Sequence, residues 1–340
     1  MGDASRAPSS GESFPDTLVP LWDERIGRSP TGAPGLGDSI VVTQASDRWV
    51  SVYLRQSGER VWHSRLKGPG ATGPIFTGEQ VFAASGDSKG QLHAYDLMTG
   101  KRTWHERVGP VVGPIAKVGQ RVIAATRTGW VIALDAANGE ARWSRPFPRP
   151  LRAGVTALGE QILVATGDSL YLLDARSGFV DASSPAPGAL FSPPAVADSF
   201  VVVTSPDGFI SAFHASTLEP LWEIPTNDPV FGNPAIARDT AFAVTQNGTL
   251  WMIPLEFPED AGTVPLGVVV RAGPSPLARG VLIATVHGEV AWFVPEVAEP
   301  LWLRQFKGPI ETPPVLDRGK LFILDAGGRI HVWGEPPAEQ

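Results

Sequence analysis

The feature that most constrains this sequence is a repeat with a period of 40 residues. A proline begins an alternating apolar segment in seven of eight equally spaced slots, and Gly154 occupies the remaining one. Turn glycines follow the same period, and so do tryptophans that come after a polar turn. The prolines are Pro34, Pro74, Pro114, Pro194, Pro234, Pro274 and Pro314. Because periods of about 40 to 45 residues are typical of propeller blades, the sequence predicts eight repeated units.

Each unit consists of short β-strands separated by turns. In the unit that spans 115–143, the runs RVIAAT and GWVIALDA alternate in polarity, and the turn Asn138-Gly139 follows them. Alternation with this punctuation indicates hairpins, and no window shows the apolar spacing of a capped helix. Blades that cover one another leave only short sheet edges. We therefore expect an all-β protein, an eight-bladed β-propeller of four-stranded blades.

The two ends of the repeat region predict how the ring closes. After Pro314 the sequence contains three strand-like pieces and no fourth. The segment Thr17 to Gly27, TLVPLWDERIG, precedes the first proline slot and is similar to the outer strand PLWLRQF near the C-terminus. We expect this N-terminal strand to complete the last blade. The predicted organisation is a flexible polar leader at 1–16, one propeller at 17–334 and a C-terminal tail at 335–340.

Composition excludes several functional classes. The 28 basic and 35 acidic residues give a net charge of -7, which opposes binding to nucleic acid or to an anionic membrane surface. The absence of cysteine excludes disulfides, thiolate metal sites and cysteine nucleophiles. No stretch approaches the roughly 18 apolar residues of a membrane span, and the N-terminus has no signal-peptide pattern. We expect a soluble chain.

Candidate catalytic and metal-binding residues are missing from the sequence. The six histidines lie in different repeats and have no metal-ligand spacing. Neither a nucleophile elbow nor a phosphate-binding glycine loop occurs, and the glycines already have a role in turns. The sequence predicts no catalytic residue, no metal site and no cofactor.

Two repeats carry a more specific motif. AYDLMTGKRTW at 94–104 and ALDAANGEARW at 133–143 share the form Ala-x-Asp-x-x-x-Gly-x-x-x-Trp. This form resembles the tryptophan-docking repeat of the PQQ-type quinoprotein β-propellers, a WD40-like architecture. We expect the Asp to accept turn N–H groups, the Gly to adopt a positive φ and the Trp to fill the gap between blades. The predicted docking residues are Trp22, Trp62, Trp104, Trp143, Trp222 and Trp302.

The resemblance implies two kinds of function. Quinoprotein dehydrogenases of this superfamily clamp PQQ with a vicinal Cys-Cys disulfide and hold Ca²⁺ with an acidic cluster. This chain has no cysteine and no matching cluster, so we expect that it is not an enzyme. A PQQ-dependent dehydrogenase relative remains one alternative, and an extracytoplasmic sensor or ligand-binding propeller is another.

In length and plan, the chain looks closest to the outer-membrane β-barrel assembly lipoproteins of the BamB type. That resemblance implies a cofactor-free scaffold for protein-protein interaction, a monomeric propeller located in the periplasm or cell envelope. It also implies an N-terminal lipid anchor in the native form and an outer-membrane assembly pore protein as partner.

One loop combines basic and apolar side chains. The run SRPFPRPLRAG at 144–154 interleaves arginines with Phe147 and Leu151. BamB-type proteins present an exposed Leu-Arg pair to their partner in a comparable loop, and Leu151-Arg152 is the local match. We expect partner contacts from Arg145, Phe147, Arg149, Leu151 and Arg152. The alternative interpretation is a solvated basic loop on an acidic protein.

Overall fold

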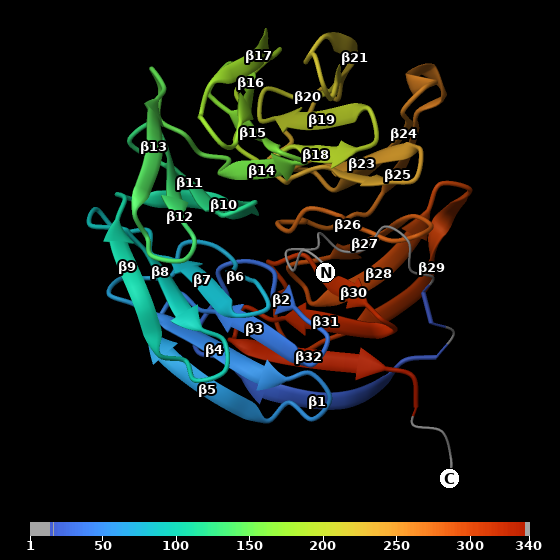
Figure 1. Cartoon of the computed structure of the whole chain (residues 1–340). Coiled ribbons are helices and arrows are strands. Elements are labelled where there is room, and N and C mark those ends of the chain that lie inside the picture. The colour runs from blue at the N-terminus through green and yellow to red at the C-terminus, as the bar shows by residue number, and fades with distance from the viewer. Residues whose placement is uncertain (1–13, 16, 337–340) are drawn as a thin grey trace.

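Eight antiparallel sheets of four strands stand side by side in a ring (Figure 1). The computed structural model describes residues 14, 15 and 17–336. Most of the predicted leader, 1–16, and of the predicted tail, 335–340, lies outside these described residues. Within them, the prediction of an all-β, eight-bladed propeller is confirmed.

We number the blades in chain order, each from the axis outwards. Blade 1 contains β2 (Gly35–Leu36), β3 (Ile40–Gln44), β4 (Trp49–Leu54) and β5 (Arg60–Arg65). Blade 2 contains β6 (Ile75–Phe76), β7 (Gln80–Ala84), β8 (Gln91–Asp96) and β9 (Arg102–Arg107). Blade 3 contains β10 (Val111–Val118), β11 (Arg121–Thr126), β12 (Trp130–Asp135) and β13 (Ala141–Pro146). Blade 4 contains β14 (Val155–Leu158), β15 (Gln161–Ala165), β16 (Ser169–Asp174) and β17 (Val180–Pro185).

The second half of the ring repeats this plan. Blade 5 contains β18 (Ala195–Ala197), β19 (Phe200–Ser205), β20 (Phe209–His214) and β21 (Pro220–Pro225). Blade 6 contains β22 (Ala235–Ala237), β23 (Thr240–Val244), β24 (Thr249–Pro254), the 3-10 helix η1 (Pro258–Asp260) and β25 (Gly262–Pro265). Blade 7 contains β26 (Ser275–Pro276), β27 (Val281–Ala284), β28 (Glu289–Val294) and β29 (Val297–Gln305). Blade 8 contains β30 (Val315–Asp317), β31 (Lys320–Leu324), β32 (Arg329–Gly334) and β1 (Val19–Arg25).

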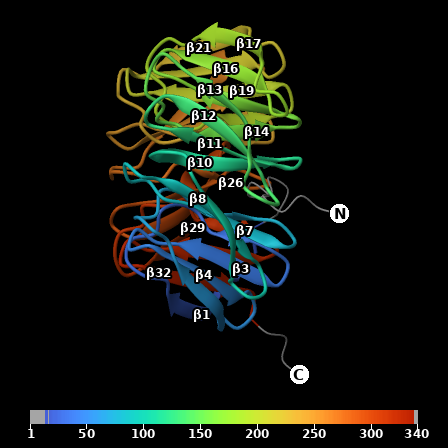
Figure 2. The same cartoon turned by 60° about the vertical axis from the view of Figure 1, so that its left-hand side comes forward.

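The N-terminal strand closes the ring, as the repeat pattern predicts. Strand β1 pairs antiparallel with β32, from Val19 opposite Gly334 to Arg25 opposite Arg329, and the two lie together in both views (Figures 1 and 2). A buried ion pair joins the first and last blades further inwards. The Arg55 side chain is 6% exposed, and its Nη1 lies 2.5 Å from Asp317 Oδ2. Because an unpaired buried charge costs several kcal/mol, this pair makes the register between blades 8 and 1 specific.

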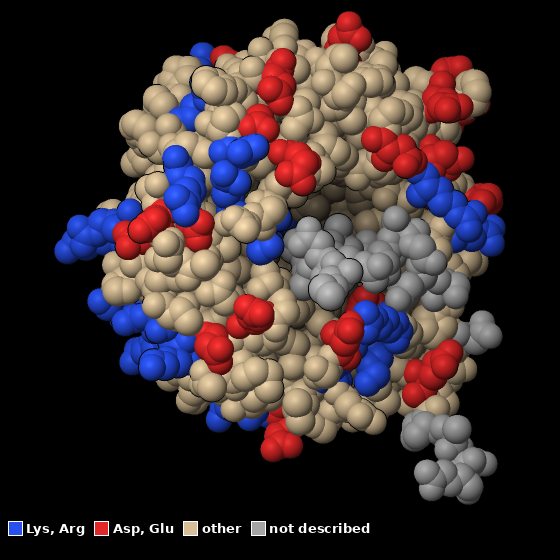
Figure 3. Space-filling view, in the orientation of Figure 1, with Lys and Arg blue, Asp and Glu red and all other residues tan. Residues whose placement is uncertain are grey.

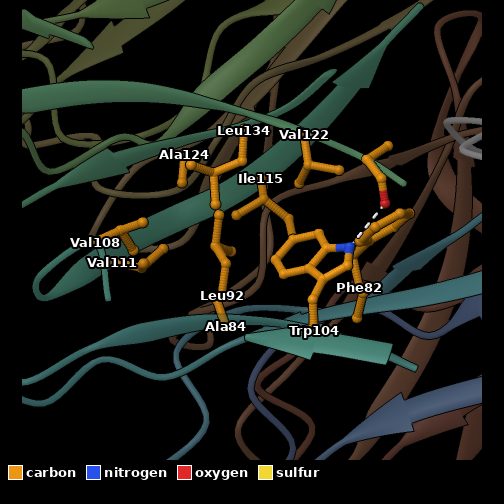
Figure 4. Close-up of a cluster of buried hydrophobic side chains, with 12 residues drawn as sticks. Phe82, Ala84, Leu92, Trp104, Val108, Val111, Ile115, Val122, Ala124 and Leu134 are labelled. Carbon is orange, nitrogen blue, oxygen red and sulfur yellow. Dashed lines mark hydrogen bonds between the residues drawn. The ribbon is translucent and has the colours of Figure 1, made fainter. Parts of the chain in front are cut away.

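Hydrophobic layers between adjacent blades form the core. The layer between blades 2 and 3 shows the arrangement, in which Phe82 and Leu92 of one blade face Val122 and Leu134 of the next (Figure 4). Trp104 extends from the outer strand β9 into this layer, and its Nε1 donates a hydrogen bond of 2.9 Å to the carbonyl of Ala136 (Figure 4). Burying apolar area contributes about 25 cal/mol per Å², so these layers supply most of the stabilisation.

The docked tryptophan explains a glycine in the next blade. Gly139 has a φ of 78°, and a Cβ atom there would lie 2.7 Å from the Trp104 ring. Trp22, Trp62 and Trp143 meet Gly58, Gly100 and Gly178 in the same way. Each indole Nε1 donates to a backbone carbonyl of the neighbouring blade, at Arg55, Leu97 and Ala175 respectively. Close packing of ring against backbone therefore requires both residues of each pair.

The last interface before ring closure uses a different residue. Phe14 is 9% exposed; its ring stacks on Trp292 with centroids 4.9 Å apart and makes a tilted contact with Trp302 at 5.0 Å. Trp302 comes from β29 of blade 7, and blade 8 has no turn between its third and fourth strands because those strands come from opposite ends of the sequence. Phe14 thus packs on Trp302, whereas a turn glycine packs on each docked tryptophan in the first half of the ring.

Candidate functional site

The segment 147–154 joins β13 of blade 3 to β14 of blade 4 and carries four of the five predicted partner-binding residues, while Arg145 lies on β13 itself. Its course is held by the adjacent turn, since the Phe147 N–H donates to the Gly129 carbonyl at 2.7 Å. Gly129 has a φ of 84°, and a Cβ atom there would lie 2.9 Å from the carbonyl oxygens of Phe147 and Arg149. The loop therefore lies directly against the β11–β12 turn.

The structure corrects the expectation that Leu151 is exposed in this loop. Its side chain is 0% exposed and packs in a buried cluster with Val155, Ile162 and Val164. It therefore fastens the loop to the core between blades 3 and 4 and does not present an apolar surface to a partner. The period of 40 residues did not predict this result, because the slot of Leu151 holds both Val111, which is 2% exposed, and Phe231, which is 54% exposed.

The arginines of the loop point to different partners. Arg145 Nε donates to the Gly178 carbonyl at 2.5 Å, which directs this side chain to blade 4. Arg149 forms an exposed ion pair with Asp168, with Nη2 and Oδ2 3.1 Å apart. The Arg152 guanidinium lies over the ring of Phe191, 4.5 Å from its centroid. Exposed pairs of this kind contribute at most about 1 kcal/mol, so Arg149 and Arg152 can exchange these contacts for a ligand.

One aromatic side chain begins the loop and a second lies beside it. Phe147 is half-buried and makes an edge contact with Tyr171, with centroids 5.0 Å apart. Trp130 is 41% exposed, lies opposite Pro146 in the sheet and directly follows the turn glycine beneath the loop. Sequence reasoning did not include Trp130 in the site. Its signal was a tryptophan on the third strand of a blade, outside the docking slots of the repeat.

The axis of the ring contains a cavity of about 540 Å³. Glycine, proline and alanine from the inner strands dominate its wall, with Lys117, Asn233 and Asp317 among the polar residues. A hollow is visible near the centre of the ring (Figure 3). Within the part of the chain that the structure describes, no three His, Asp or Glu side chains lie together in a way that could hold a metal ion. None of the helices described there is long and apolar enough to cross a membrane.

A family model described as outer membrane protein assembly factor BamB matches residues 19–153 and 127–256. A BamB from Burkholderia pseudomallei (strain K96243) is 27% identical over 210 residues, which cover 57% of this chain and 55% of that relative. The chain thus aligns with little more than half of the relative's length.

Solved structures share the whole ring. The crystal structure of BamB from Moraxella catarrhalis is similar with a TM-score of 0.82 and 17% identity, covering 94% of this chain and 100% of that one. A europium-containing methanol dehydrogenase is similar with a TM-score of 0.78 and 10% identity, covering 94% and 93%. At such low identity, both likenesses show the fold alone.

Proposed function

The chain belongs to the family of the outer membrane protein assembly factor BamB, and on that premise we propose that it is a cofactor-free scaffold for protein-protein interaction in the bacterial cell envelope. Its proposed role is to bind a pore protein of outer-membrane protein assembly from the periplasmic side. A lipid anchor at the N-terminus of the native protein would hold it there. The match of the family model, whose two segments together span 19–256, carries this proposal.

The proposed contact surface is the loop at 147–154 with its flanking aromatics. Arg149 and Arg152 supply planar cations that can bind carboxylates in a bidentate way, and Trp130 supplies exposed aromatic area beside them. Arginine and tryptophan are the residue types most enriched at the energetic centres of interfaces. Leu151 supports this surface indirectly. Its buried side chain keeps the loop in one conformation, which lowers the entropy lost on binding.

The test is co-purification with the periplasmic domains of the assembly pore protein from the same bacterium. Replacing Arg149→Glu and Arg152→Glu together should lower the recovered pore protein about tenfold or more, because both charges reverse at the contact. The matched control, Arg176→Glu with Arg238→Glu, changes two exposed arginines of blades 4 and 6 and should leave recovery unchanged. Unchanged thermal unfolding would show that the loop variant still folds.

Two results would count against the scaffold role. One is equal recovery of the pore protein with wild type and with the loop variant, which would remove this loop from the interface. The other is a deletion strain with normal amounts of outer-membrane proteins, which would contradict the role in assembly itself.

We further propose that the chain does not use a quinone. The support is the wall of the central cavity, where small apolar residues predominate and where, among the described residues, the single carboxylate Asp317 is already paired with Arg55. Titration with PQQ and Ca²⁺ in a calorimeter should give no binding heat. Saturable binding together with dye reduction in the presence of an alcohol would contradict this proposal.

A further inference from the structure

The net charge of the chain conceals a strong separation of charge around the ring. Between residues 17 and 154 there are 18 Lys and Arg and 11 Asp and Glu, whereas between 155 and 336 there are 9 and 20. One half of the ring therefore has an excess of seven positive charges and the other an excess of eleven negative charges. In the space-filling view, Lys and Arg gather along the flank where β5 and β9 lie, and Asp and Glu gather on the opposite upper side (Figure 3).

The positive charge is concentrated on two outer strands. Strands β5 (RVWHSR) and β9 (RTWHER) repeat the pattern Arg-x-Trp-His-x-Arg in the same positions of adjacent blades. The tryptophan of each strand is buried between blades, whereas the arginines at both strand ends are exposed. We refer to the four arginines as the basic wall. They are Arg60, Arg65, Arg102 and Arg107.

The basic wall is not neutralised by the protein itself. Within the described residues, none of its four arginines forms a salt bridge, whereas Arg142 on the neighbouring outer strand β13 is paired with Asp135 at 2.7 Å. Glu106 is the single acidic residue on β5 and β9. Unpaired exposed cations in a group cost self-repulsion, and an anionic partner relieves that cost.

Burial and the nearby positive charges both lower the pKa values of two histidines beside the wall. Burial lowers the pKa of His105, and the charges of Arg102 and Lys67 lower it further. The same two charges, together with His105, lower the pKa of the buried His93 beyond the effect of burial. Both imidazoles are therefore neutral at pH 7. The charge of this flank comes from arginine and lysine and persists across the physiological pH range.

The geometry favours a polypeptide over a lipid bilayer. Eight blades share the full circle, so the outward-facing edges of adjacent outer strands point about 45° apart. A flat surface therefore touches one outer strand at a time. Peripheral membrane binding normally adds exposed apolar anchors to the cations. Here Val61 is the single exposed large apolar side chain on β5 and β9, whereas the exposed leucines of the outer strands, Leu221, Leu301 and Leu303, lie on blades 5 and 7. An extended chain can follow the curved wall.

The backbone of the wall supports the same choice. Strands β5 and β9 are each the last strand of their sheet, so their outer N–H and C=O groups have no neighbouring strand. A polypeptide can hydrogen-bond to such an edge, while a lipid headgroup uses the side chains alone.

We propose that β5 and β9 form a docking surface for an acidic, extended segment of a partner protein, held by Arg60, Arg65, Arg102 and Arg107. This inference rests on the proposed scaffold role in taking the ligand to be a polypeptide. The basic wall would thus make a contact separate from that of the loop at 147–154. The outer strand β13 lies between the two surfaces.

The experiment uses the full chain and a fluorescent peptide of alternating Glu and Thr. The peptide has about 20 residues and spans about 65 Å when extended. A peptide of alternating Gln and Thr is the uncharged control. Fluorescence anisotropy measures affinity for the wild type, for a wall variant with all four arginines replaced by Gln, and for a control variant with Arg176, Arg238, Arg279 and Arg304 replaced by Gln. The two variants lose the same charge.

The expected result is a loss of affinity of about tenfold or more in the wall variant and less than about twofold in the control variant. Wild-type affinity should fall as NaCl is raised from about 0.05 to about 0.5 M, because screening shortens the range of these charges. Circular dichroism and thermal unfolding verify that both variants fold.

Three outcomes would overturn the proposal. Equal losses in the two variants would show an effect of net charge alone, and equal binding of the Glu and Gln peptides would exclude recognition of acidic side chains. Flotation with phosphatidylglycerol vesicles that depends on the wall, without peptide binding, would assign the wall to a membrane. None of these outcomes bears on co-purification of the pore protein through Arg149 and Arg152, so the two proposals fail separately.

Discussion

The first and second halves of the ring join their blades in different ways. From blade 8 through blade 4, four consecutive interfaces pair a tryptophan with a left-handed glycine of the next blade. The other four depart from this pattern. Ala182 faces Leu218 between blades 4 and 5. Trp222 keeps the hydrogen bond to the next blade, at the Leu255 carbonyl, but no described glycine packs against its ring. Gly262 stands in the tryptophan slot of blade 6, and Trp302 of blade 7 meets Phe14.

The interface between blades 4 and 5 shows that the docked tryptophan serves to fill the space between blades. Where the outer strand has Ala182, the turn of the next blade has Leu218, which is 1% exposed and packs in the same cluster. Leu218 keeps a positive φ of 57°, although it is not a glycine. The turn conformation and the filled volume are thus retained, while the side chain that fills the space comes from the opposite blade. The requirement is a packed layer and not a particular residue.

The largest effect should come from removing a docked tryptophan. Trp104→Ala should lower the free energy of unfolding by about 3 to 5 kcal/mol, because it leaves a cavity and removes the hydrogen bond to Ala136. Urea denaturation measures this loss. Trp130→Ala is the matched control, since this ring is 41% exposed and should cost less than about 1 kcal/mol. Equal costs would contradict the importance of docking.

An intermediate effect should appear when the interface between blades 4 and 5 is given the tryptophan and glycine pair of the first four interfaces. Ala182→Trp alone overfills the layer, and Leu218→Gly alone leaves a cavity, so each should cost about 1 to 3 kcal/mol. The double variant should cost less than the sum of the two by about 1 to 3 kcal/mol, because indole and glycine then fit together. A double-mutant cycle from urea denaturation measures the difference. Simple additivity would show that the two sites do not compensate each other.

The effect that is smallest at neutral pH concerns a buried histidine between blades 1 and 2. His93 is 0% exposed, and neither of its ring nitrogens has a hydrogen-bond partner among the described residues. Burial, then Arg102, His105 and Lys67, lower its pKa from 6.5 to about 3. As the pH falls below 6.5, the unfolded chain therefore binds a proton that the native protein does not bind. Stability present above pH 6.5 is lost progressively towards about pH 3.

This group should contribute a slope of up to about 1.4 kcal/mol per pH unit in the acid range. Replacing His93→Leu should reduce the slope of unfolding free energy measured by urea denaturation between about pH 6 and pH 4. His287→Leu, at an exposed position of blade 7, serves as the control and should leave the slope unchanged. An unaltered slope in the His93 variant would contradict the assignment.

The fold was predictable because the period of the sequence is the period of the structure. Eight proline and glycine slots at intervals of 40 residues correspond to eight inner strands, and the strand missing after Pro314 identified Thr17 to Gly27 as its replacement. These are properties of position along the chain. They can be recognised without knowledge of what any side chain touches.

The compensating contacts were not predictable in the same way. Leu218 and Phe14 fill spaces whose other walls belong to a different blade, so their roles depend on neighbours that are distant in the sequence. The candidate site shows the same limit. Alternation of arginine and apolar residues in the loop did not reveal that Leu151 turns inwards, and its slot in the repeat holds both the buried Val111 and the exposed Phe231.

Closure of the ring joins a strand that is synthesised first to a strand that is synthesised last. Strand β1 is made first, yet its partner β32 lies about 300 residues later, as the contact between Asp23 and Arg329 across 306 residues illustrates. At about 5 to 20 residues per second, this strand waits about 15 to 60 s with an unpaired edge. The nascent chain therefore carries an unsatisfied strand throughout its translation. Its tendency to aggregate should be greatest just before the last blade is complete.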